Sequence, residues 1–142
     1  MASASYSPRP GWFQVVALLA VLWNLFGVAM YLSSVGIFGD TMAGLGEAER
    51  AAASSIPPLI TSAFAIGTFT GLIGSLGLLL RKAWAQPVLI VSLIALLVLE
   101  GWILFLSGAV EMFGLAVPIM VSAGAILLAW LATHARRRGW LS

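Results

Sequence analysis

One acidic side chain, Glu100, lies inside a long apolar stretch, and it is the residue best suited to carry chemistry. An ionisable group within a membrane span costs several kcal/mol unless it is paired, protonated or facing water. Glu100 therefore indicates a proton or cation site, or a bond to a partner helix. The alternatives are a carboxyl close enough to the interface to reach water, or one kept neutral by burial. Because no other apolar stretch contains a base, a partner would be a neutral polar group, Arg50 or another chain.

Asn24 is a second polar residue in apolar surroundings, near the middle of the first such stretch. An amide at the centre of a bilayer requires a hydrogen bond, usually across a helix interface. We therefore expect Asn24 to join two helices, and contact with a substrate is the alternative. Asn24 and Glu100 are expected at different depths, so they form a direct bond only if their helices are offset.

A row of small residues occupies the second apolar stretch. Its members are Ala63, Gly67, Gly71 and Ser75, which recur every fourth residue, with Gly74 beside them. Small residues at this spacing allow two helix backbones to approach closely. We expect this row to pack within the chain, and a face for a homo-oligomer or a partner protein is the alternative.

The residue sets that usually perform catalysis are missing from the sequence. There is no cysteine, and His134 is the sole histidine. Zinc and haem sites need several such ligands at fixed spacing, so neither is expected within one chain. Paired carboxylates and a Ser/His/Asp set are also missing. We expect a non-enzymatic protein without a cofactor.

Membrane-crossing helices are the elements that must position these residues. The chain has 142 residues, of which 61% are apolar and 8% are charged. A soluble domain carries about 25% charged residues, so this chain cannot cover itself with a polar surface. A helix needs about 20 apolar residues to cross a bilayer. Four stretches meet this requirement, at roughly 12–35, 57–80, 84–107 and 115–133.

The connections indicate how these spans are arranged. Most are short, which predicts antiparallel neighbours. The fold class is thus all-α: an integral-membrane four-helix antiparallel bundle forming one domain over residues 1–142. The longest connection contains Glu47–Ala53, which forms either a short helix at the membrane surface or a solvated loop with one helical turn. The first stretch exceeds the apolar core of a signal peptide, so we expect it to be retained.

The distribution of charged residues predicts the orientation of the chain in the membrane. One side of the four-span arrangement holds the bases Arg9, Arg81, Lys82, Arg136, Arg137 and Arg138. The other side holds the acids Asp40, Glu47, Glu49 and Glu111, together with Arg50. Basic loops stay in the cytoplasm, so both termini and the turn at 81–82 are expected there. We expect the bases at 81–82 and 136–138 to anchor on anionic lipid headgroups. They form no stripe suited to nucleic acid.

Several stretches together resemble one protein family. They are Trp23-Asn24-Leu25 with Gly27 and Tyr31, Thr61–Gly67, Gly71–Ser75, Leu79–Ala85 with Pro87, Phe105–Gly108, Glu111–Gly114 and Ala135–Leu141. Over nearly its whole length the chain resembles small four-span inner-membrane proteins of proteobacteria, which are often labelled sugar transporters. The resemblance implies location in a bacterial inner membrane and supplies no established catalytic or binding residue. Polar or aromatic residues are common in that family near the position of Glu100, so an acid departs from the pattern.

Three functions fit these features. The first is an accessory or structural subunit that packs against a larger membrane complex, through the small-residue row or the face of Glu100. The second is a transporter of a small solute such as a sugar, which works as a homo-oligomer because four helices enclose little room. The third is a proton-linked role centred on Glu100. The expected partners are the lipid bilayer and either other membrane subunits or further copies of this chain.

Overall fold

The computed structural model describes residues 8–40, 42–108, 110–111 and 114–142. The described part contains five helices and no strand. They are α1 (Gly11–Ser34), α2 (Glu47–Ser54), α3 (Pro58–Leu79), α4 (Ala85–Phe105) and α6 (Ala116–Arg137). All but α2 are long and apolar enough to cross a membrane. The prediction of an all-helical chain with four helices long and apolar enough to cross a membrane is confirmed for the described residues.

The long helices begin and end within two residues of the predicted limits, apart from the end of α6. That helix continues to Arg137, four residues past the expected limit. Its last turn contains His134, Arg136 and Arg137. Basic side chains near the C-terminal end of a helix interact favourably with the helix dipole. Hydropathy alone could not show this extension, because the added turn is polar.

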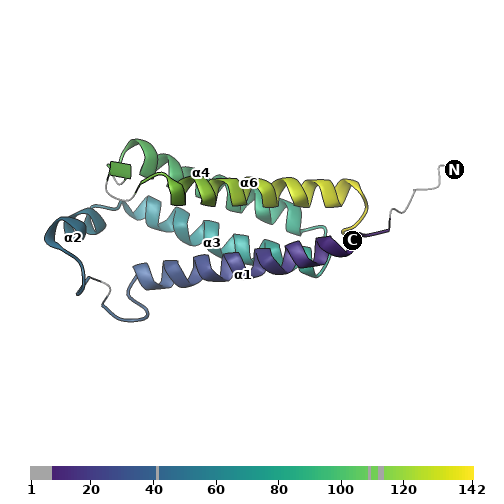
Figure 1. The fold of residues 1–142 in the computed structure, drawn as a ribbon, viewed down its shortest axis with the longest axis horizontal. Coiled ribbons are helices and arrows are strands. Elements are labelled where there is room, and N and C mark those ends of the chain that lie inside the picture. The colour runs from purple at the N-terminus through teal and green to yellow at the C-terminus, as the bar shows by residue number, and fades with distance from the viewer. Residues whose placement is uncertain (1–7, 41, 109, 112–113) are drawn as a thin grey trace.

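Residues 47–54 form the two-turn helix α2, so of the two interpretations of this segment the helix is correct. Its first turn is closed by Glu49, whose Oε2 accepts a hydrogen bond from the Gly46 N–H at 2.9 Å. Arg50 donates to the carbonyls of Met42 (2.9 Å) and Ala43 (3.2 Å). The helix and the loop before it are thereby held together at one end of the molecule (Figure 1).

Three long helices end in the same backbone motif, with a left-handed residue just after the cap. That residue is Gly36 after α1 and Gly139 after α6, but after α3 it is Arg81, with φ of 62°. There the Lys82 N–H donates to the Gly77 carbonyl at 2.8 Å, which satisfies a carbonyl left free by the last helical turn. The motif turns the chain sharply, so that only five residues separate α3 from α4.

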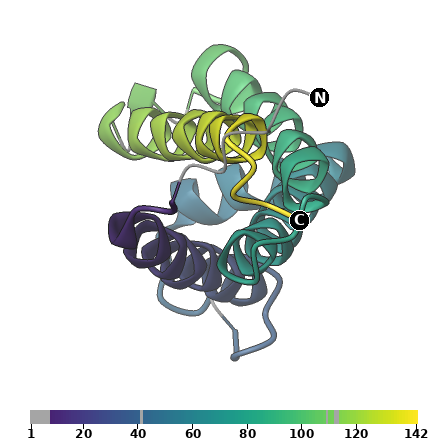
Figure 2. The same ribbon diagram turned by 90° about the vertical axis from the view of Figure 1, so that its right-hand side faces the viewer.

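The helices pack in the order α1, α3, α4, α6. Helix α3 lies between α1 and α4, and α4 packs in turn against α6. Helices α1 and α6 are not among the closely packed pairs, so the bundle has a seam between them (Figure 2). Because each helix is apolar on most faces, small side chains rather than an apolar stripe decide which faces meet.

The segment after α6 closes one end of the bundle. The Ser142 N–H donates to the Arg81 carbonyl at 2.8 Å, and the Ala83 N–H donates to the Ser142 carbonyl at 3.0 Å. Trp140 and Leu141 are buried beside the start of α1 in the main apolar core. Residues 139–142 therefore connect the end of α6 to the turn between α3 and α4.

Candidate functional site

Asn24 forms a polar junction between α1 and α3. Its Nδ2 donates to the Ser75 Oγ at 3.0 Å and to the carbonyl of Ala20 at 2.9 Å. The Ser75 hydroxyl donates in turn to the Gly71 carbonyl at 2.7 Å. Asn24 is 8% exposed and Ser75 is fully buried, so the bond between them lies inside the bundle. Sequence reasoning did not identify Ser75 as the partner of Asn24.

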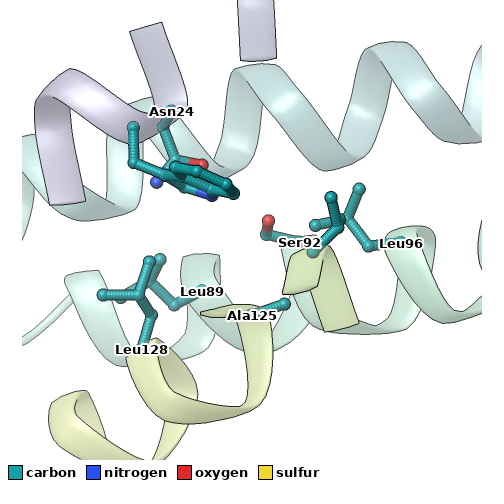
Figure 3. Close-up of a pocket in the computed structure, with 8 residues that line it drawn as sticks. Asn24, Leu89, Ser92, Leu96, Ala125 and Leu128 are labelled. Carbon is teal, nitrogen blue, oxygen red and sulfur yellow. The ribbon is translucent and has the colours of Figure 1, made fainter. Parts of the chain in front are cut away.

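Ser92 of α4 reaches the same region from the other side of α3. Its hydroxyl donates to the Gly67 carbonyl at 2.7 Å. A Cβ placed on Gly71 would overlap the Asn24 Oδ1 and lie 3.0 Å from the Ser92 Oγ. Figure 3 shows Asn24, Ser92 and their apolar neighbours around this point. The three helices α1, α3 and α4 can therefore approach this closely only because residue 71 has no side chain.

Ser92 is a functional candidate that sequence reasoning missed. It lies eight residues before Glu100, so the two occupy the same face of α4, and both are buried. That spacing was available in the sequence. An isolated serine in an apolar helix is nevertheless a weak signal, because its hydroxyl can bond to the helix's own backbone without any partner.

The small-residue row of α3 is in contact with neighbouring helices of the same chain. An added Cβ would meet Leu96 at Gly67 and Leu89 at Gly74, at 2.7 and 2.6 Å respectively. Ala63 is also buried. These positions are occupied by packing within the chain, so the row offers no free face for a second protein.

The bundle encloses very little free space at this junction. A void of about 10 Å³ lies between Asn24, Ser92, Leu96 and Ala125 (Figure 3). That volume is at the lower limit for one water molecule. The polar junction has room for a water and none for a sugar-sized solute.

Glu100 lies in the last turns of α4, away from this junction. Gly67 pairs with Leu96 and Gly74 with Leu89, so the antiparallel register places Glu100 level with Ala63. Ala63 and Gly71 are eight residues apart on α3, or about 12 Å along the helix. The structure thus does not bring Glu100 and Asn24 together.

The carboxyl of Glu100 is buried without full hydrogen bonding. The side chain is 4% exposed, and its Oε2 has no hydrogen-bond partner among the described residues. A buried ionised carboxylate without a partner is strongly unfavourable in an apolar medium. A proton, a cation or a donor from another molecule would each relieve this cost.

The basic residues at 81–82 and 136–138 lie at the end of the bundle opposite α2 (Figure 1). Arg81, Lys82, Arg136, Arg137 and Arg138 are all exposed. Of these, Arg136 is tied to α4, because its Nη1 donates to the Gln86 Oε1 at 2.6 Å. His134 stacks on Trp130, with the ring centroids 5.2 Å apart, and meets the edge of Trp140 at 5.6 Å.

A groove follows the seam between α1 and α6. Its volume is about 300 Å³. Val16, Leu19 and Trp23 line it from α1, and Gly124, Leu127 and Leu131 from α6. The groove is apolar and opens on the outside of the bundle, where a membrane protein meets lipid.

The described residues contain no group of three or more His, Cys, Asp or Glu side chains that could hold a metal ion. A comparison of the chain with models of protein families, with curated proteins and with solved structures found no match in any of the three. The four apolar helices make the chain a multi-pass integral membrane protein that contacts the lipid bilayer.

Proposed function

We propose that this chain is a non-enzymatic accessory subunit that packs against a larger complex in a bacterial inner membrane. In this proposal both termini and the turn at 81–82 face the cytoplasm. The excess of bases at that end supports this orientation, because basic loops are retained in the cytoplasm. The bases at 81–82 and 136–138 then lie at the level of the lipid headgroups.

The location of the free space is the observation that carries this proposal. The void beside Asn24 holds about 10 Å³, whereas the groove that opens toward lipid holds about 300 Å³. A carrier needs an interior site for its solute, usually with several convergent polar groups. Here Asn24, Ser75 and Ser92 already bond to one another or to helix carbonyls. The outer surface is therefore the part of the chain best placed to bind a partner protein.

The proposal is tested by the mass of the native assembly and by cross-linking. A photo-reactive residue is placed at the exposed positions Leu22 (α1), Ile94 (α4) and Ile126 (α6), and at the fully buried Leu78 as a control. After mild extraction we expect a complex with a different protein, and cross-links to it from at least one exposed position but not from Leu78. A chain that migrates alone, or only as copies of itself, contradicts the proposal. The homo-oligomer would then be assayed for solute transport.

A proton-linked role of Glu100 is the second candidate, and the buried, unbonded Oε2 favours it. Glu100→Gln tests this role, because an amide keeps the shape of the carboxyl but does not ionise. For an accessory subunit we expect the variant to assemble as the parent does, with no change in proton flux across proteoliposomes measured with an internal pH dye. Glu111→Gln, an exposed acid of the same half, is the matched control. Flux in the parent that only Glu100→Gln abolishes would establish the proton-linked role instead.

A further inference from the structure

We propose that the groove between α1 and α6 binds one acyl chain of an anionic phospholipid, whose headgroup lies against the basic residues at the end of α6. This site goes beyond the packing role proposed above and does not depend on it.

The lining of the groove indicates its occupant. Val16 and Trp23 mark its ends on α1, and seven residues of helix span about 10 Å. The side chains that line the groove are apolar, and it opens on the outer surface of the bundle. A hydrocarbon chain that lies along α1 and α6 would contact this lining over its length.

Gly124 and the indole of Trp23 form the end of the groove that lies farther from the basic residues. Gly124 faces Trp23, and a Cβ on Gly124 would lie 3.7 Å from the indole Nε1. Because residue 124 has no side chain, α6 projects least into the groove at this position. A large side chain at residue 124 would enter the groove, whereas the neighbouring Ala123 is exposed and does not line it.

Helical spacing places His134 and Arg138 in line with the residues of α6 that line the groove. The lining residues of α6 include Gly124, Leu127 and Leu131, and the same three- and four-residue steps continue to His134 and Arg138. On α1 the corresponding step from Val16 leads to Trp12. The rings of Trp12 and Trp140 meet edge to face at 6.0 Å, so aromatic side chains join the start of α1 to the segment after α6 at this end of the seam.

The charge of this end is complementary to a phosphate headgroup. Arg137 and Arg138 are exposed at the end of α6, about two helical turns past Leu131. No acidic residue occurs in the segments that form this end of the bundle, 8–34, 79–90 and 131–142. Indole rings and basic side chains together are typical of protein surfaces at the headgroup level of a membrane. An apolar groove that ends about two helical turns from these bases matches the two parts of an anionic phospholipid.

The test counts the lipid that the isolated chain retains. The protein is reconstituted in equal parts of phosphatidylcholine and phosphatidylglycerol, extracted again, and examined by native mass spectrometry. We expect the parent chain to keep one phosphatidylglycerol. Gly124→Phe fills the groove and should abolish this retention, whereas the matched variant Ala123→Phe should keep it. The helix content of both variants is checked by circular dichroism.

A second pair of variants tests the headgroup contact without touching the groove. A base near a membrane surface contributes enough attraction that its loss weakens binding of an anionic lipid by about fivefold. We expect Arg138→Gln to lower retention of phosphatidylglycerol by about that factor. Arg50→Gln, an exposed base in α2 at the opposite end of the bundle, should leave it unchanged.

Three outcomes would overturn the proposal. They are equal retention of the two lipids, equal behaviour of Gly124→Phe and Ala123→Phe, and a parent mass that shows a second copy of the chain in place of lipid. The measurement uses the isolated chain, so its result is independent of whether a partner complex exists.

Discussion

Replacement of Gly71 by alanine is expected to lower the free energy of unfolding by about 3 kcal/mol, since extra methyl groups in a closely packed interior typically cost 1–3 kcal/mol and a lost polar contact adds to this. The new Cβ would overlap the Asn24 Oδ1 and press on the Ser92 Oγ. Asn24 must then rotate away, which breaks its bond to Ser75. The measurement is unfolding of the purified protein by titration of a denaturing detergent, followed by circular dichroism.

Gly101→Ala is the matched control for this prediction. Gly101 also lies in a membrane-crossing helix, but an added Cβ there has no heavy atom within 4 Å. Alanine favours helix more than glycine does, so the control should be neutral or slightly stabilising. If both variants unfold at the same detergent concentration, α1 and α4 do not approach α3 closely at Gly71 in the folded protein.

Trp140→Ala is expected to have an effect of similar size at the basic end of the bundle. Removal of a buried Trp typically costs 3–5 kcal/mol, because it leaves a cavity as well as lost contacts. The ring of Trp140 meets Phe13 at 5.5 Å, Trp12 at 6.0 Å and His134 at 5.6 Å between centroids. Its loss would separate the start of α1 from the end of α6. The same detergent titration measures the change.

Two further variants show whether packing is the cause. Trp130→Ala removes an indole that is 58% exposed on the outer face of α6, so we expect it to cost far less than Trp140→Ala. Trp140→Phe keeps an aromatic ring in the core and removes the Nε1, which is buried without a partner among the described residues. It should retain most of the stability. A Trp140→Phe variant as unstable as Trp140→Ala would contradict a packing role.

The positions of the four long apolar helices were predictable from sequence, and the physical reason is simple. Four apolar runs of about 20 residues can be satisfied in a bilayer only as helices. Prolines such as Pro57 and Pro58 mark where α3 begins, since the first helical turn does not need their missing N–H groups. These signals are local, so they can be read without knowing what each helix contacts.

The contacts between helices were far less predictable. Lipid is as apolar as the interior of the bundle, so hydropathy does not distinguish the inner face of α3 from the outer one. Its small residues indicated close packing, but only the structure shows that Gly67 and Gly74 face α4 while Ser75 faces Asn24 of α1. The depth of Glu100 relative to Asn24 likewise depends on the register between three helices.

The seam and the closing segment were not predicted at all. No residue pattern marks α1 and α6 as the pair that stays apart, because the groove results from how the other pairs pack. The bases at 136–138 gave no sign of what the residues after them do. Gly139 turns the chain back, and Trp140 and Leu141 enter the core. Arg81 also gave no sign that it would adopt a left-handed conformation.

The pairing of Ser142 with the turn between α3 and α4 has a consequence for the biogenesis of this protein. Helices α3 and α4 are neighbours in sequence and can associate as soon as both have entered the membrane. The carbonyl of Arg81 and the N–H of Ala83 gain their partners from Ser142 only after α6 has also crossed. Formation of these two bonds therefore requires α6 to be in its folded position. A chain in which α6 has not yet packed would leave the Arg81 carbonyl and the Ala83 N–H without these partners.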